Sequence, residues 1–340
     1  MENPQIALQN QSVDEWLDQL AHGFRTSQVL FAACRLAVFD ALEGPATVGE
    51  LAARLGASRR GLRILLDALV GLGLLDRCED RYGNTPLAER FLTKRSADSR
   101  VHRMLHGARL YERWAGLAEA VRTGRPVPEE RIPPELAGDR RAFARAMADS
   151  ARSIARQTAA ALDLRGVRRL LDVGGGPGVY AVAFAERESN LEVTILDDAE
   201  TLEVAAQTVR GAGLDGRIHL LPGNALEMDF DGTFDLVFVS NVLHIYSAER
   251  NRELVRRAAA ALSPGGRLVL KDFFLDEGSD AGKRGPTWNL LFAVNMLVST
   301  EGGDCYTESE VLGWCRDVGL ELVQRIPLTP RATMLVTARP

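Results

Sequence analysis

Short apolar runs alternate with amphipathic stretches over the second half of the chain. Five of these runs predict buried parallel strands, at residues 167–173, 191–196, 217–221, 234–239 and 267–271. The segments between them, such as 248–262, repeat apolar residues at helical spacing. The last two runs, 320–326 and 333–338, predict an antiparallel pair. Strand and helix in alternation predict an α/β fold with a doubly wound sheet.

The first hundred residues have a different pattern. Residues 13–42 show helical spacing, 47–55 and 59–69 predict two shorter helices, and a hairpin with its turn near 79–83 follows. Thr47 and Glu50 have the spacing of a capping box, which marks the start of a helix. This order predicts a mainly helical N-terminal domain of winged-helix type.

A winged helix often binds DNA, but another use is favoured here. Residues 47–95 contain nine Lys or Arg and six Asp or Glu, a weakly basic balance. The apolar helical stretch at 13–42 instead suits packing against a second copy of the chain. We therefore expect a homodimer and no nucleic-acid partner.

A glycine-rich turn follows the first strand of the predicted sheet, at residues 170–178. Gly174 and Gly176 allow a tight turn and a close approach of a ligand to the main chain. A dinucleotide site needs a third glycine at the position of Val179, so that pattern fails. Asp172 instead suits a cationic ligand, such as the sulfonium and ammonium of S-adenosylmethionine. Asp197, at the end of the second strand, is placed to bind ribose hydroxyls.

Composition and charge narrow the remaining choices. The 340 residues are 46% apolar and 26% charged, with a formal net charge of -5, which argues against a general polyanion binder. The four cysteines are scattered and predict reduced thiols in a cytoplasmic protein. Residues 1–12 lack the pattern of a signal peptide, and no run reaches the length of a membrane span. His102 and His106 have helical spacing but no third ligand, so no metal site is predicted.

Four motifs together make the chain resemble a known family. They are LLDVGGGPG at 170–178, SNVLHIYSAE at 240–249, LSPGGRLVLKDFFLD at 262–276 and NMLVSTEGGDCYT at 295–307. The pattern resembles the class I S-adenosylmethionine-dependent small-molecule O-methyltransferases of the plant caffeate and bacterial polyketide type. The resemblance implies a winged-helix dimerisation domain at 1–98, a helical linker and substrate-pocket region at 99–163, and a Rossmann-like catalytic domain at 164–340 that binds the cofactor.

The resemblance also implies cofactor contacts. Gly174 and Asp197 match family positions that contact the cofactor backbone and ribose. Asn224 stands where the family often has an aspartate near the adenine, with Ala225 next to it. Ser240 stands where plant members have a lysine whose main chain matters more than its side chain.

For catalysis, the resemblance points to His244, which matches the family's catalytic histidine. Asp272 stands where plant members carry a glutamate that orients this histidine, and Cys305, beside Asp304, replaces a second glutamate. The side chains predicted to line the acceptor pocket are Tyr111, Trp114, Asn295 and Tyr306. For Tyr111 and Trp114, packing in the core is the alternative.

The chemistry can also be argued from the residues. A phenol has a pKa near ~10, so a base assists its methylation, and histidine is suited to take the proton at neutral pH. His244 and Asp272 follow the fourth and fifth strands, which would be neighbours in this sheet. We therefore predict an S-adenosylmethionine-dependent O-methyltransferase of a small, aromatic or polyketide-type acceptor. The alternatives are a C- or N-methyltransferase, a family member that binds the cofactor without transferring methyl, and a winged-helix regulator.

Overall fold

The computed structural model describes residues 12–136, 140–227, 229, 233–276 and 285–340. Residues 1–11, on which most of the expectation about a signal peptide rests, lie outside this description. The chain divides into two compact units, 1–109 and 110–340. The three-part division made from the sequence stays a prediction. Within the described residues, no helix is long and apolar enough to cross a membrane.

The first unit consists of short helices around a small antiparallel sheet with the order β1-β3-β2. Its helices are α2 (Val13–His22), α3 (Phe24–Arg35), α4 (Val38–Ala41), α5 (Val48–Leu55), α6 (Arg59–Gly71), α7 (Pro86–Phe91) and most of α8 (Val101–Trp114). Its strands are β1 (Ala46–Thr47), β2 (Leu75–Cys78) and β3 (Arg81–Asn84). Helices and hairpin thus follow one another in the predicted order.

Local signals in the sequence explain where these helices begin. Thr47 and Glu50 form the expected capping box, in which the Thr47 Oγ1 accepts from the Glu50 N–H and the Glu50 carboxylate accepts from the Thr47 N–H. Ser58 caps α6, because its side chain accepts from the Gly61 N–H. The single apolar face expected over 29–42 is interrupted, because Ala37 has a left-handed φ of 53° that ends α3, and Leu36 is left exposed.

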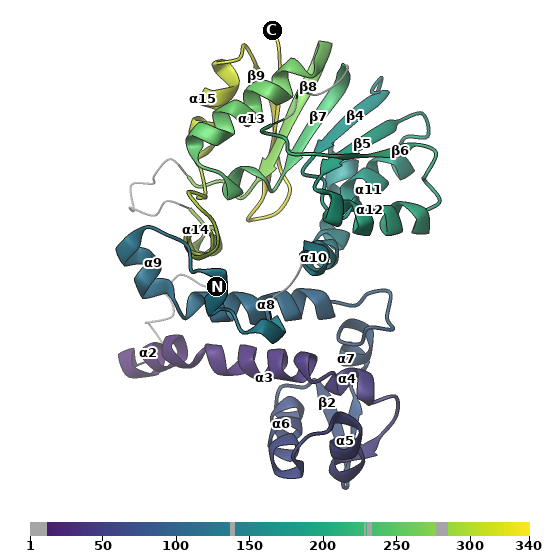
Figure 1. Cartoon of the computed structure of the whole chain (residues 1–340), viewed down its shortest axis with the longest axis vertical. Coiled ribbons are helices and arrows are strands. Elements are labelled where there is room, and N and C mark those ends of the chain that lie inside the picture. Colours follow the sequence, from purple (N-terminus) through teal and green to yellow (C-terminus); the bar gives the residue numbers. More distant parts are fainter. Residues whose placement is uncertain (1–11, 137–139, 228, 230–232, 277–284) are drawn as a thin grey trace. The chain divides into compact units, whose positions relative to one another are not determined.

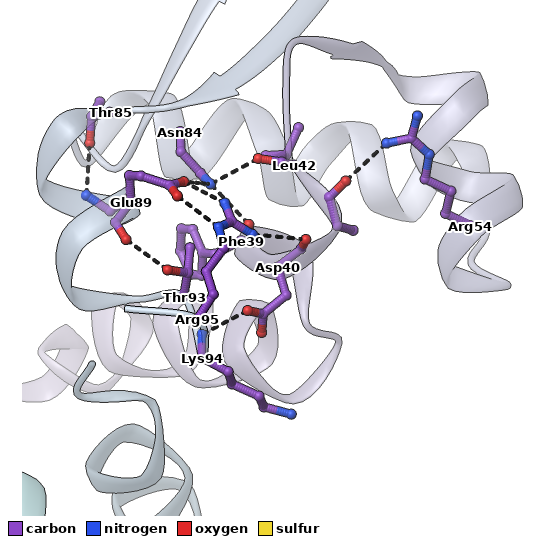
Figure 2. Close-up of polar contacts among 12 residues, drawn as sticks. Phe39, Asp40, Leu42, Arg54, Asn84, Thr85, Glu89, Thr93, Lys94 and Arg95 are labelled. Atoms are coloured by element: carbon purple, nitrogen blue, oxygen red, sulfur yellow. Dashed lines mark hydrogen bonds and ion pairs between the residues drawn. The ribbon is translucent and has the colours of Figure 1, made fainter. Parts of the chain in front are cut away.

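A polar network joins the segments of this unit around Asn84, at the end of β3 (Figure 2). Its Nδ2 donates to the carbonyls of Phe39 (2.9 Å) and Leu42 (3.2 Å) and to the Glu89 carboxylate (2.9 Å). Arg95 forms a bidentate pair with the same carboxylate. One amide therefore satisfies two main-chain carbonyls at the end of α4 that no helix continues to pair.

The second unit contains a seven-stranded sheet with the order β6-β5-β4-β7-β8-β10-β9. Its strands are β4 (Arg169–Val173), β5 (Glu192–Asp197), β6 (Ile218–Pro222), β7 (Phe234–Ser240), β8 (Leu262–Asp272), β9 (Glu321–Pro327) and β10 (Thr333–Ala338). The first five are parallel, and β10 pairs antiparallel with both β8 and β9. The predicted α/β sheet and its terminal antiparallel pair are confirmed.

Helices cover both faces of this sheet (Figure 1). One apolar cluster packs α10 (Arg140–Ala161), α11 (Val179–Arg187) and α12 (Ala199–Gly211) on one face. A second cluster packs α13 (Ala248–Ala260) and α15 (Glu308–Arg316) on the other. Helix α14 (Thr287–Ser299) contacts α9 (Leu117–Thr123) and the short 3₁₀ helix η3 (Leu243–Ile245). Burial on both faces explains why the parallel strands are continuous apolar runs.

The strand predicted at 267–271 begins earlier in the structure. β8 (Leu262–Asp272) already starts at Leu262 and pairs there with Phe234. The register shifts between Phe234 and Leu236, so the glycines form an irregularity within the strand. A Cβ on Gly266 would lie 2.9 Å from the Ser263 carbonyl oxygen, which explains the glycine there.

Asn84→Ala is expected to destabilise the first unit by about 1–3 kcal/mol, because it leaves the Phe39 and Leu42 carbonyls without their donor. Calorimetric unfolding of the full chain would measure this as a lower transition temperature. Arg54→Met is a matched control: it removes an exposed donor to the Ala41 carbonyl and should change stability by less than about 0.5 kcal/mol. Equal effects of the two substitutions would contradict the role given to Asn84.

Candidate active site

The carboxyl ends of the parallel strands meet where the strand order reverses, between β4 and β7. After β4 the chain turns through three glycines with left-handed φ, Gly174 (66°), Gly176 (57°) and Gly178 (76°). A Cβ on Gly174 would lie 2.7 Å from Val242, and one on Gly175 would lie 2.7 Å from the Asp172 carboxylate. The turn therefore admits no side chain at these two positions, of which the sequence had pointed to Gly174 but not to Gly175.

Asp172, the penultimate residue of β4, is a buried acid. Its side chain is fully buried, and neither carboxylate oxygen has a hydrogen-bond partner within the described part of the chain. Burial, reinforced by the charge of Asp197, raises the pKa of Asp172 to about 8. A buried carboxylate without a donor is costly, and a cationic ligand would offset that cost.

Asp197, the last residue of β5, closes the glycine turn from the neighbouring strand. Its Oδ2 accepts from the Gly176 N–H at 2.8 Å, and its Oδ1 accepts from the Asp198 N–H at 2.8 Å. Burial raises its pKa to about 6, against the opposing effect of these two backbone donors. Asp198 in turn caps α12. The acid thus lies directly beside the glycine turn, as its position in the sequence predicts.

The other three residues predicted to bind the cofactor lie at the same edge with different roles in the fold. Asn224 is exposed, and its side chain accepts from the Leu226 N–H and donates to Glu227. Ala225 packs on the edge of the second apolar cluster. Ser240 is buried at the end of β7, and its hydroxyl has no hydrogen-bond partner within the described residues.

His244 and Asp272 lie together where β7 and β8 end, as the sequence predicts. The His244 Nδ1 lies 2.7 Å from the Asp272 Oδ1, and the His244 main-chain N–H donates to Oδ2 at 3.4 Å. Asp272 therefore holds both the ring and the backbone of His244. Both side chains are buried, which strengthens this interaction.

Asp272 is the ionised partner of this pair. Burial alone would raise the pKa of Asp272, but His244, the Phe273 N–H and Lys271 together hold it below its ordinary value. An ionised carboxylate only accepts hydrogen bonds, so the proton lies on Nδ1 of His244. In the neutral imidazole with this tautomer, Nε2 carries the lone pair.

Residues from two other segments, α13 and the loop between α14 and α15, hold η3, the turn that carries His244. Asn251 of α13 donates to the carbonyls of Leu243 (2.8 Å) and Tyr246 (3.2 Å), and the Tyr306 hydroxyl donates to the Tyr246 carbonyl at 2.5 Å. A Cβ on Gly303 would lie 2.4 Å from the His244 carbonyl oxygen. The histidine is thus fixed by its main chain as well as by Asp272.

An aromatic group beside His244 was missed in the sequence. The Phe292 ring meets the imidazole edge to face at 4.8 Å, Phe273 lies 6.0 Å from it, and Trp288 stacks on Phe292 at 5.0 Å. Trp288, Phe292 and Asn295 are spaced i, i+4, i+7 on α14, a signal that could have revealed one face of this helix. These rings give the surroundings of His244 an apolar, aromatic character.

The four residues predicted to line an acceptor pocket are only partly brought together. The Trp114 Nε1 donates to the Asn295 Oδ1 at 2.9 Å. Tyr111 is half-buried on α8, and among the described residues no hydrogen bond or ring pair joins it to His244. Tyr306 packs its ring on Trp314 in the core. Together with His244 it also lines a cavity too small to hold a water molecule, whose other lining residues are Leu243, Asp272, Phe273, Phe274 and Cys305.

Cys305 is buried in that cavity. Burial, reinforced by Asp272 and Asp304, raises the pKa of its thiol to about 12, and the Sγ donates to the Asn289 carbonyl at 3.5 Å. The residue is therefore a neutral thiol and cannot supply the negative charge of a carboxylate to His244. Within the described ranges, no group of three His, Cys, Asp or Glu side chains could hold a metal ion.

Two family profiles match the chain. The O-methyltransferase dimerisation domain matches residues 18–94, and the O-methyltransferase domain matches residues 133–314. The two matches together account for most of the chain, and the second alone covers more than half of it.

Individual proteins agree with these profiles. The chain is 33% identical to 3-hydroxy-5-methyl-1-naphthoate 3-O-methyltransferase of Streptomyces sahachiroi, over 91% of this chain and 90% of that protein. It is 30% identical to the tetracenomycin polyketide synthesis 8-O-methyl transferase TcmO of Streptomyces glaucescens, over 95% and 96%. Human N-acetylserotonin methyltransferase, solved in complex with SAM, is 29% identical with a TM-score of 0.84, over 97% and 98%.

Asp172→Asn is expected to stabilise the ligand-free protein, and more so as the pH rises. The pKa of Asp172 is about 8 in the folded chain and about 3.9 when unfolded. Wild type therefore loses stability as the pH rises from about 4 through about 8, a loss that asparagine does not share. Urea unfolding at pH 5, 6.5 and 8 should show that the difference in unfolding free energy between variant and wild type widens to at least about 2 kcal/mol. A gap that does not change with pH would contradict the buried, unpartnered state of Asp172.

Proposed function

The chain belongs to the family of S-adenosylmethionine-dependent O-methyltransferases, and from this premise we propose that His244 is the base that deprotonates the acceptor hydroxyl. The hydrogen bond between His244 and Asp272 carries the proposal. It fixes the ring and leaves Nε2 free to accept a proton. Asp272 then stabilises the imidazolium that results from the transfer.

The residues at the glycine turn fit the cofactor. Asp172 offers two unpartnered oxygens to a cationic group, and Gly174 and Gly175 leave space where any side chain would clash. Asp197 suits ribose hydroxyls, because a carboxylate accepts from both of them. When bound, S-adenosylmethionine supplies an electrophilic methyl group on a sulfonium. Asp172 and Asp197 would hold its charged and sugar parts, with Asn224, Ala225 and Ser240 around them.

The surroundings of His244 support an aromatic acceptor. Phe273, Trp288 and Phe292 present ring faces and edges that favour stacking with another ring. Asn295 lies on the same face of α14 as Phe292, and it would bound the acceptor on that side together with Trp114 of α8, which donates to it. The relatives named for naphthoate and polyketide substrates support the same class of acceptor. The acceptor is therefore a small aromatic or polyketide-type metabolite with a free hydroxyl group.

His244→Gln should lower turnover by ~10²–10⁴, the usual contribution of a general base. Glutamine retains an amide in place of the ring, so binding of S-adenosylmethionine, measured by calorimetry, should change by less than about threefold. Turnover is best measured with the labelled cofactor against a panel of naphthols and hydroxylated polyketides.

Asp272→Asn serves as the companion variant. It should lower turnover less than His244→Gln does, because the imidazole that accepts the proton is still present. The loss in both variants should shrink for acceptors with more acidic hydroxyl groups. The proposal would be refuted if His244→Gln kept near wild-type turnover on every acceptor that is methylated. Asp304 and Tyr306 would then be the next residues to test as the base. Cofactor affinity that falls as far as turnover would make His244 a structural residue.

The first unit would mediate a homodimer. Helix α2 has no buried residue, and its apolar side chains Val13, Leu17 and Leu20 continue at helical spacing into Phe24 of α3. Leu17 is 50% and Leu20 64% exposed, and such a stripe suits an interface with a second copy. The match to a dimerisation domain supports this use. The four free cysteines support a cytoplasmic location.

The double variant Leu17→Glu, Leu20→Glu should shift the full chain from dimer to monomer at micromolar concentration, because two charges would be buried in the interface. Analytical ultracentrifugation reads out the mass directly. Val323→Glu, at an exposed apolar position of β9, is the control and should leave the dimer intact. A monomeric wild type would refute the assignment of this surface.

A further inference from the structure

A buried lysine precedes Asp272 on β8. Lys271 is 2% exposed, and its Nζ donates to the Asn241 Oδ1 at 2.9 Å. The ammonium also lies 5.3 Å from the ring centre of Tyr180 and 5.9 Å from that of Phe273. Burial lowers the pKa of Lys271 to about 8, against the opposing charge of Asp272. Withdrawing an ammonium from water costs several kcal/mol, so the position calls for an explanation.

The partner of this lysine sits in an unusual backbone conformation. Asn241 has a left-handed φ of 58°, which asparagine adopts more readily than most residues. At this residue the chain leaves β7 and turns toward η3 and His244. Its main-chain N–H donates to the Lys271 carbonyl at 2.8 Å. Two hydrogen bonds in opposite directions thus connect the turn to one residue of β8.

We propose that Lys271 and Asn241 are positioning residues for methyl transfer, which hold the turn before His244 against β8 so that the imidazole meets Asp272. The inference rests on the function proposed for His244. Residue 271 is bonded to the strand end that leads to His244, and its chain neighbour is Asp272. The hydrogen bond between Lys271 and Asn241 therefore links the residue directly before Asp272 to a residue three positions before His244.

The energetics favour positioning over stability as the role of Lys271. A methionine would fill the same space among Tyr180, Phe273 and the sheet without the cost of burying a charge. Asn241 is only half-buried, so water could satisfy its amide after such a change. If residue 271 served only the stability of the fold, an apolar side chain would thus serve better than lysine. The hydrogen bond to Asn241 is what an apolar side chain cannot supply.

Lys271→Met and Asn241→Gly in the full-length protein test this. Each should lower kcat by about 10- to 100-fold, the range of one hydrogen bond to a charged group, with cofactor affinity changed less than about threefold. The melting temperature of Lys271→Met should stay the same or rise. Glycine tolerates the left-handed turn without strain, so Asn241→Gly removes only the side-chain acceptor.

A direct readout of the His244–Asp272 bond keeps this inference separate from the proposed function. In protein labelled with ¹⁵N-histidine, the Nδ1–H proton of His244, assigned with His244→Gln, should shift or disappear in both variants. Asn241→Asp keeps an acceptor for Lys271 and should restore the resonance and most of kcat. Lys94→Met, a loss of the same charge at the surface of the first unit, should change neither.

Three results would overturn the inference. An unchanged Nδ1–H resonance in both variants would show that the bond does not depend on Lys271 and Asn241. A melting temperature that falls together with kcat in Lys271→Met would assign the lysine a structural role. Cofactor affinity that falls as far as kcat would instead place Lys271 in the cofactor cleft. A changed Nδ1–H resonance together with wild-type turnover of His244→Gln would refute His244 as the base. It would still support Lys271 and Asn241 as residues that position His244.

Discussion

The parallel pairing of β7 with β8 is the constraint on which the contact between His244 and Asp272 depends. In this register Ser240 lies opposite Lys271, so the segments that follow the two strands leave the sheet side by side. Asp272 is the last residue of β8, and His244 follows β7 after one turn, and a bond of 2.7 Å joins them. His244 and Asp272 belong to different segments, so local chain structure alone does not bring them together. The sheet brings them together, and the apolar layers on its two faces hold the sheet.

The same edge accumulates buried polar groups that an apolar core would exclude. Among the described residues, Asp172 has no hydrogen-bond partner for its carboxylate, and Lys271 is an ammonium between aromatic rings. Each is expected to lower the stability of the ligand-free fold, and each lies at the end of a central strand. The cost of these groups is met by the continuous apolar runs of the sheet, which are buried on both faces.

By resemblance, Cys305 stands where plant members of the family have a glutamate, and the structure shows how this affects His244. A neutral thiol beside His244 leaves Asp272 as the carboxylate that orients the ring. The aromatic rings of Phe273 and Phe292 occupy the other sides of the imidazole. The histidine thus has one charged partner and apolar walls, an arrangement in which that single hydrogen bond determines both its orientation and its tautomer.

Local patterns in the sequence determined the elements. The apolar runs gave the strands to within a few residues, Thr47 and Ser58 marked helix starts, and the glycine turn with Asp172 and Asp197 indicated the ligand edge, because these signals depend on neighbours along the chain. The strand before Asp272 was set too short, since its start depends on pairing with Phe234. Only the tertiary structure decided that Phe292, stacked on Trp288, packs against His244, that Tyr306 packs in the core, and that Lys271 bonds to Asn241. These contacts join residues far apart in sequence, and side-chain packing between distant segments leaves no periodic signal in the chain.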